Sequence, residues 1–164
     1  MKKKARLTID SREQKSLLDT FNKDRFDSIT VDGLPFADYW CSVYTDGTWT
    51  EVPIVVERKS LGDLYGTMTN GYERFKRELE RCKENNCHMI LAIEETIDRV
   101  HQGYEHSQFS GDAMLKKLGM MQVRYGLEVH YFNGRRAMAR WIEELFDACA
   151  RNLEHSPSAN SGRQ

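Results

Sequence analysis

The sequence predicts an α/β domain built on a mixed central β-sheet flanked by helices. Strand-like and helix-like segments alternate along the chain after an initial β-hairpin, which favours helices packed on a sheet. The segment "HMILAIEE" (88–95) is apolar at successive positions, as in a strand covered on both faces. The 164 residues suit one domain, which we place at 1–153, and we expect the polar tail 154–164 to be disordered.

The expected elements can be justified in chain order. "RLTID" (6–10) is a short first strand, and the segment 11–23 has apolar residues at helical spacing. Two β-rich runs flank Asp46-Gly47, a strong signal for a two-residue hairpin turn. Ser60 and Asp63 are spaced like the start of a capped helix. The later elements are helices over 71–85, 113–126 and 135–153, strands over 28–33, 88–95 and 127–132, and a polar loop over 102–112.

Two of these helices have an apolar stripe, which predicts the face that packs on the sheet. The stripes consist of Tyr72, Phe75, Leu79 and Cys82 in the first helix, and of Ala137, Trp141, Leu145 and Cys149 in the last.

The composition excludes several classes of protein. No apolar run approaches the roughly 20 residues that span a bilayer, and the start of the sequence lacks the apolar region of a secretory signal. We therefore expect a cytoplasmic protein without a membrane partner. The formal net charge is −1, whereas a protein that held DNA by a broad positive field would be far more basic. Any contact with DNA should come from local basic clusters.

The four cysteines indicate reduced thiols rather than disulfides. Cys82, Cys87 and His88 lie close together in sequence and raise the alternative of a zinc site. Their spacing is loose for zinc, and no second Cys/His pair follows.

The charged end of an apolar strand is the main functional signal. Val55 and Val56 run directly into Glu57, Arg58 and Lys59. A two-residue turn at Asp46-Gly47 would place Asp38 opposite Val55, so that Asp38 and Glu57 share one face as a diagonal pair. Their Cβ atoms would then be about 7–8 Å apart. Two carboxylates at that separation can share one Mg²⁺, and Lys59 has the same strand parity as Glu57.

An aspartate followed later in the chain by Glu-x-Lys is the signature of restriction-endonuclease-like nucleases, which hydrolyse phosphodiesters. The acidic residues hold the ion, and the lysine orients water, removes its proton or stabilises developing charge. The structural alternative is a solvated strand end whose charges form surface ion pairs.

Further motifs resemble the XPF-type structure-specific endonucleases, in that family's order. "VVERKSLGDL" (55–64) is similar to its Glu-Arg-Lys-x-x-x-Asp motif, and "TIDSREQ" (8–14) to its first-strand Asp-x-Arg-Glu. "GLPFADYW" (33–40), "GYERFKRELERCKE" (71–84) and "MILAIEE" (89–95) follow the same order. The resemblance covers about 7–147 and implies a restriction-endonuclease-like core. Ala37 stands where the family usually has glycine, so a positive φ there would strain the backbone, and Glu78 replaces the more usual glutamine.

The resemblance implies roles for individual residues. Metal ligands would be Asp38, Glu57 and the main-chain carbonyl of Arg58, and Lys59 would be the catalytic lysine. Asp10 and Glu13 would belong to the catalytic group, beside the ion or at a second ion, although each could instead serve the N-terminus of a helix over 11–23. Asp63 and Arg12 would surround the ligands, with capping as the alternative for Asp63, and Arg58 and Arg74 would support the site or contact DNA.

These implications define an expected function. We expect an endodeoxyribonuclease dependent on Mg²⁺ or Mn²⁺, which cuts branched, flap or junction DNA in repair or recombination. A homodimer is expected through the helix 137–153, with Trp141, Leu145 and Phe146 as the candidate surface; the alternative is that this helix packs on the sheet. The alternatives are a four-way-junction resolvase or a restriction-type nuclease on the same core, and a non-catalytic DNA-binding subunit.

Overall fold

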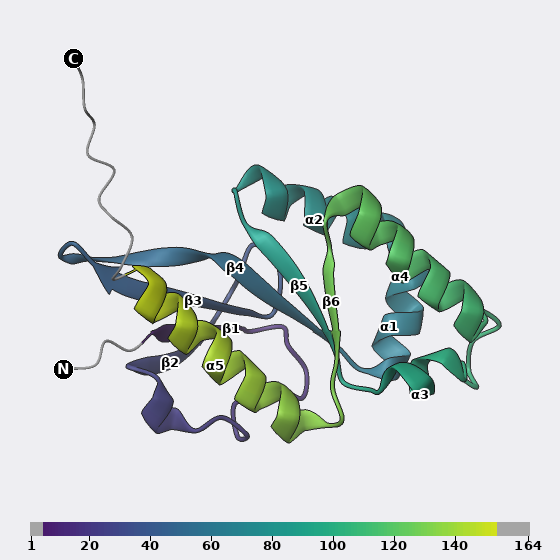
Figure 1. The fold of residues 1–164 in the computed structure, drawn as a ribbon, viewed down its shortest axis with the longest axis horizontal. Coiled ribbons are helices and arrows are strands. Elements are labelled where there is room, and N and C mark those ends of the chain that lie inside the picture. The colour runs from purple at the N-terminus through teal and green to yellow at the C-terminus, as the bar shows by residue number, and fades with distance from the viewer. Residues whose placement is uncertain (1–4, 154–164) are drawn as a thin grey trace, which may run out of the picture.

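The computed structural model describes residues 5–153 and contains a six-stranded mixed sheet with helices on both faces (Figure 1). This confirms the predicted fold class. The strand order is β2-β1-β3-β4-β5-β6, where β1 pairs with β3 and β3 with β4 in antiparallel fashion, and the other pairs are parallel. The strands are β1 (Arg6–Asp10), β2 (Ser28–Asp32), β3 (Tyr39–Thr45), β4 (Thr48–Lys59), β5 (His88–Ile93) and β6 (Glu128–Tyr131). The predicted tail 154–164 lies outside the described residues.

Five α-helices occur in the described part of the chain, and one of them was not predicted. They are α1 (Leu61–Met68), α2 (Tyr72–Glu84), α3 (Ile97–His101), α4 (Gly111–Tyr125) and α5 (Arg135–Leu153). The unpredicted helix is α3, a single short turn capped by Thr96. Among residues 5–153, no helix has the length and apolar character that crossing a bilayer requires.

The prediction of a helix over 11–23 is wrong. Residues 11–22 form turns, and only Lys23–Arg25 is helical, as one 3₁₀ turn. The main-chain groups of this segment bond to distant side chains instead. The Leu17 N–H donates to the Tyr39 hydroxyl at 2.9 Å, and Arg135 donates to the carbonyls of Lys15 and Ser16 at 2.9 and 2.7 Å. Tertiary contacts therefore override the apolar spacing.

The β3–β4 hairpin has the predicted turn but not the predicted register along its whole length. Thr45 faces Thr48, and the pairing then shifts so that Tyr39 faces Val56. Pro53 lies in the irregular stretch, where its missing N–H breaks no ladder bond. Continuing the shifted register places Asp38 beside Glu57 rather than opposite Val55. Because the shift is two residues, both carboxylates keep the same face.

Two apolar cores pack on the two faces of the sheet. One joins α1, α2 and α4 to the face that carries Val55, Leu91 and Ile93. The other joins α5 and the segment 17–26 to the face that carries Val56 and Ala92. The predicted stripe of α2 is largely confirmed, since Phe75, Leu79 and Cys82 are buried and Tyr72 is half-buried.

The predicted stripe of α5 is displaced by one position. The buried residues of this helix include Met138, Ile142 and Phe146, while Trp141 and Leu145 are only half-buried and Ala137 is exposed. Two adjacent apolar stripes exist in this sequence, and only one can face the sheet. Phe146 is fully buried and therefore cannot belong to an exposed surface of the helix.

The four cysteines are all free, and three of them are buried. The Cys82 thiol donates to the Cys87 carbonyl at 3.3 Å. The described chain contains no group of three or more His, Cys, Asp or Glu residues arranged to hold a metal ion, so nothing supports the zinc alternative.

Candidate active site

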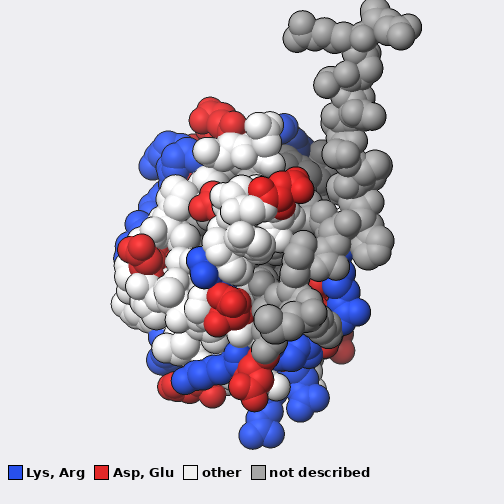
Figure 2. Space-filling view, turned by 90° about the vertical axis from the view of Figure 1, so that its left-hand side faces the viewer, with Lys and Arg blue, Asp and Glu red and all other residues white. Residues whose placement is uncertain are grey.

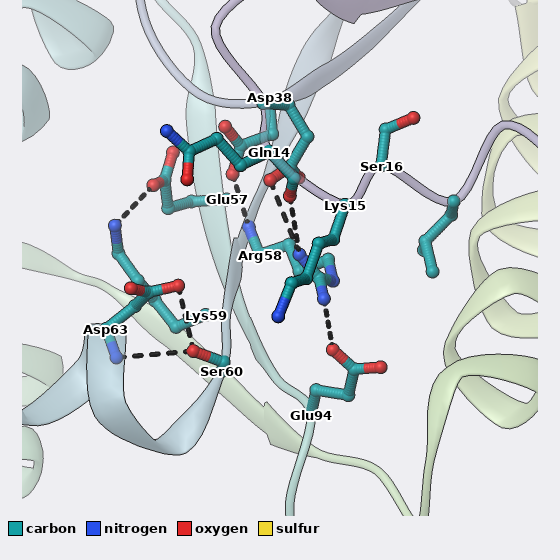
Figure 3. A network of polar contacts seen from close by, with 12 residues as sticks. Gln14, Lys15, Ser16, Asp38, Glu57, Arg58, Lys59, Ser60, Asp63 and Glu94 are labelled. Carbon is teal, nitrogen blue, oxygen red and sulfur yellow. Dashed lines mark hydrogen bonds and ion pairs between the residues drawn. The ribbon is translucent and has the colours of Figure 1, made fainter.

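The charged triplet Glu57-Arg58-Lys59 forms the carboxyl end of β4, in the middle of the sheet. Strand alternation sends Glu57 to the face covered by α1, α2 and α4, and Arg58 to the face covered by α5. Figure 3 shows the result, with Lys59, Glu57 and Asp38 on one side of the strand and the Arg58 side chain passing to Glu94 on the other. The chain continues directly from Lys59 through Ser60 into α1, which fixes the end of the strand.

Asp38, Glu57 and Lys59 lie together, as predicted. The Oδ2 atom of Asp38 accepts a hydrogen bond from the Arg58 main-chain N–H at 2.8 Å, which ties this carboxylate to the end of β4. The Nζ atom of Lys59 lies 2.9 Å from Oε1 of Glu57. Glu57 is 5% exposed, so its carboxylate is held in a site with little access to solvent.

Burial dominates the electrostatics of these groups. It raises the pKa of Asp38 to about 7, with the Glu13 carboxylate adding to the shift. It also raises the pKa of Glu57 well above the ordinary value, and the charge of Asp38 adds to this. Burial tends to lower the pKa of Lys59, but the Glu57 and Asp38 carboxylates outweigh it and the pKa is raised. The lysine is therefore held as an ammonium group.

Glu13 and Arg58 belong to a second set of contacts on the opposite face. Nη1 of Arg58 lies 3.3 Å from Oε1 of Glu13, and Nη2 donates to the Glu94 carboxylate. Burial raises the pKa of Glu13 to about 7, against the opposing charge of Arg58. Arg135 extends the set from the first turn of α5, with Nη1 3.7 Å from Glu94.

Two atoms in this set, Oε2 of Glu13 and Nε of Arg58, are buried and make no hydrogen bond in the structure. The Arg58 side chain is 5% exposed. This placement suits support of the site rather than contact with DNA.

Asp10 and Arg12 pair with each other at the end of β1. Nε of Arg12 lies 3.0 Å from Oδ2 of Asp10, and Oδ1 of Asp10 accepts the Leu34 N–H at 2.9 Å. Because no helix begins after Asp10, the capping alternative for Asp10 and Glu13 does not apply. The Asp10 N–H donates to the Asp38 carbonyl at 2.8 Å, so β1 also positions Asp38.

Asp63 and Arg74 lie on the helices that follow β4, Asp63 in α1 and Arg74 in α2. The Ser60 hydroxyl accepts the Asp63 N–H at 3.2 Å and donates to the Asp63 carboxylate at 2.8 Å, which is a capping arrangement. Arg74 is exposed on α2 and is available to solvent.

Three residues of this region were not assigned a role from the sequence. Glu94 and Arg135 are half-buried: Glu94 is the partner of Arg58, and Arg135 contacts Glu94 and the carbonyls of Lys15 and Ser16. Glu78 accepts the Ala37 N–H at 2.8 Å. A signal existed for Glu94, because it directly follows Ile93 in the family-like segment "MILAIEE" (89–95). No local pattern distinguishes Arg135 from its basic neighbours.

The donor chemistry fits a small divalent cation. Asp38 and Glu57 are hard oxygen donors, and their raised pKa values reflect a site that a cation would make favourable for two negative charges. Mg²⁺ commonly uses one or two carboxylates and keeps several waters, so a set of only two acidic side chains is sufficient.

The chain belongs to the ERCC4 domain family, whose match covers residues 9–145. No curated protein matches the chain. Two similar solved structures are XPF from Aeropyrum pernix and XPF from Aeropyrum pernix in complex with DNA. They share 20% and 19% identity with this chain, at TM-scores of 0.65 and 0.64, and each match covers 91% of this chain. The matches cover 67% and 66% of those proteins, so this chain spans about two thirds of their length.

Family membership confirms the resemblance to XPF-type nuclease domains, and the similar structures confirm the fold. At this level of sequence identity, the two similar structures support the fold alone.

Proposed function

We propose that this protein is a metal-dependent DNA endonuclease that cuts at branched, flap or junction DNA. The observation that carries the proposal is the convergence of Asp38, Glu57 and Lys59 at the end of β4, inside an ERCC4 domain. One of the similar solved structures is a complex with DNA, which supports DNA as the partner.

Asp38 and Glu57 would hold Mg²⁺ or Mn²⁺, together with the main-chain carbonyl of Arg58. When bound, the ion supplies a Lewis acid for the phosphate and lowers the pKa of water at the site. Lys59 would donate hydrogen bonds to water or to a phosphate oxygen and stabilise developing negative charge. Its raised pKa favours this role over that of a general base, because an ammonium group has no lone pair to accept a proton.

The other predicted residues would act around this centre. Asp10 would lie beside it, held by Arg12, and Glu13 would act on it from the other face of the sheet, where it contacts Arg58 and where its charge adds to the raised pKa of Asp38. Asp63 would stabilise the start of α1, which follows Lys59 in the chain. Arg74 is exposed and would contact the DNA backbone.

The surface charge suits a small contact with DNA. Figure 2 shows one face on which basic and acidic side chains lie close to one another. With a net charge of −1, local residues such as Arg74 would supply the affinity. We also propose a homodimer through α5, and a cytoplasmic location in keeping with the four free cysteines.

A cleavage assay on labelled flap, fork and four-way-junction DNA tests the proposal, with Mg²⁺, Mn²⁺ or EDTA. We expect cleavage only with metal, and Lys59→Ala should reduce the rate by about 10²–10³ while DNA affinity is retained. Unreduced cleavage by Lys59→Ala would remove the mechanism.

The same panel separates the alternatives. Paired symmetric cuts across a four-way junction would indicate a resolvase, and a fixed sequence would indicate a restriction-type enzyme. A non-catalytic subunit would bind DNA without cleavage, and a calorimetric titration would detect no Mn²⁺ at the site.

A further inference from the structure

Glu78 reaches from α2 to the chain segment that carries Asp38. The helix is anchored by its buried residues Phe75 and Leu79, which lie three residues before Glu78 and one residue after it. Oε1 of Glu78 accepts a hydrogen bond from the Ala37 N–H at 2.8 Å. The contact thus joins a helix packed on the core to the residue directly before a proposed metal ligand.

Ala37 has a backbone conformation that is unfavourable for alanine. Its φ is +62°, in the left-handed region, where the Cβ atom of an L-residue crowds the backbone. Its exposed fraction is 3%, so the residue sits in a closed environment. A buried alanine persists in this region only where its surroundings hold it there.

Ala37 is the residue through which the chain enters Asp38, whose main chain is bonded on both sides. The Asp38 N–H donates to the Val56 carbonyl at 3.0 Å, and its carbonyl accepts the Asp10 N–H at 2.8 Å. With those main-chain groups fixed, the turn at Ala37 sets how the chain enters Asp38. Relaxation of Ala37 to a negative φ would rotate this entry and move the carboxylate away from Glu57.

We propose that Glu78 is a positioning residue, which holds Ala37 in its left-handed conformation and thereby directs the Asp38 carboxylate to the metal. This inference rests on the proposed function, because it takes Asp38 to be a metal ligand. The Glu78 carboxylate provides a charge-assisted acceptor, which is stronger than a neutral one and offsets the strain at Ala37. Glu78 acts through Ala37 and does not itself hold the ion.

The test uses Mn²⁺ affinity, measured by calorimetric titration, so that its readout does not depend on cleavage. Glu78→Leu should weaken Mn²⁺ binding by about 10–100-fold, the usual effect of losing a residue that supports a ligand. Glu78→Gln keeps an acceptor oxygen and should bind Mn²⁺ more tightly than Glu78→Leu. The matched control is Glu80→Leu, which makes the same change at an exposed position of α2 and should leave affinity unchanged.

The decisive variant adds Ala37→Gly to Glu78→Leu. Glycine adopts positive φ without strain, so it should restore most of the lost affinity, whereas Ala37→Gly alone should change affinity little. If Glu78→Leu weakened Mn²⁺ binding only by removing a negative charge near the site, Ala37→Gly would not restore the affinity. Circular dichroism and thermal unfolding confirm that each variant is folded before its affinity is compared.

The outcomes separate the inference from the proposed function. Equal Mn²⁺ affinity in Glu78→Leu and the unaltered protein, or no restoration by Ala37→Gly in a folded double variant, would overturn the inference alone. Mn²⁺ binding with the expected order of variants, but no cleavage of any DNA, would overturn the proposed function alone. Absence of Mn²⁺ binding by the unaltered protein would overturn both.

Discussion

At the scale of single residues, Arg58 is a buried charge that lies between two carboxylates. Its side chain is 5% exposed and is flanked by the Glu13 and Glu94 carboxylates. Replacement by leucine would leave both acidic groups without their buried partner. We expect Arg58→Leu to lower the free energy of unfolding by about 3–5 kcal/mol, measured by urea denaturation at pH 8.

The control for this experiment is an arginine that is exposed. Arg74→Leu removes the same charge from the surface of α2 and should change stability by no more than about 0.5 kcal/mol. Similar small losses in both variants would mean that Arg58 contributes no more than a surface charge.

The raised pKa values of Asp38 and Glu13 predict an unusual dependence of stability on pH. Both are about 7 in the folded protein, whereas ordinary carboxyl groups titrate near about 4. Between these values the native state binds more protons than the unfolded state, so these groups make stability fall as pH rises. The penalty is absent below about pH 4 and complete above about pH 7.

Thermal unfolding in EDTA from pH 4.5 to 8 measures this effect in metal-free protein. The fall in stability across this window should be smaller in Asp38→Asn than in the unaltered protein, because the variant lacks one of the carboxyl groups whose pKa is raised. An identical slope in both proteins would contradict the raised pKa of Asp38.

The sequence allowed the convergence of Asp38, Glu57 and Lys59 to be predicted, but not the residues that contact and support them. Asp38, Glu57 and Lys59 follow from strand alternation and one recognisable turn, which are local rules. The bulge shifted the register by two residues, and the shared face survived because the shift was even. Glu78, Glu94 and Arg135 come from distant elements, and their contacts depend on how those elements pack. The sequence comparison indicated backbone strain at Ala37 if its φ were positive, and the φ of Ala37 is positive.

At the scale of elements, buried strands and stripes were predictable, and short or constrained segments were not. Consecutive apolar residues identified β5, because a strand covered on both faces needs no alternation. The segment 11–22 had helical spacing, but Tyr39 and Arg135 bind its main chain in another conformation. For α5 the pattern offered two neighbouring stripes and no means of choosing between them.

The junction of α3 and α4 gives a prediction at this scale. Gly111, at the start of α4, packs so closely on α3 that an added Cβ would lie 1.7 Å from the His101 carbonyl oxygen. Gly111→Ala must therefore move one helix, and we expect a loss of about 1–3 kcal/mol in unfolding free energy.

Gly119 provides the matched control in the same helix. An added Cβ there meets nothing within 4 Å, so Gly119→Ala should stabilise the protein by about 0.5–1 kcal/mol through helix propensity. Chemical denaturation measures both variants. Stabilisation by both substitutions would show that α3 and α4 are not in close contact.

At the scale of the whole molecule, the edge formed by β6 and the outer side of α5 is where we expect the proposed dimer to bind a second copy. β6 is the last strand of the sheet, so one of its sides lacks a neighbouring strand. Trp141 lies beside it, with its ring 5.0 Å from Phe132 and 5.1 Å from His130. These aromatic groups and Leu145 are only half-buried within one chain.

Sedimentation velocity tests whether this edge joins two copies. We expect the unaltered protein to sediment as a dimer, and Trp141→Glu as a monomer at the same concentration, because a buried carboxylate would oppose association. Arg140→Glu introduces the same group at the adjacent, exposed position and should remain dimeric. If the unaltered protein is a monomer, the proposed dimer does not form. If both variants form dimers of equal affinity, the contact lies elsewhere on the surface. Since Trp141 is on the half-buried stripe and not in the core, the substitution should leave the fold intact, which the far-ultraviolet circular dichroism spectrum checks.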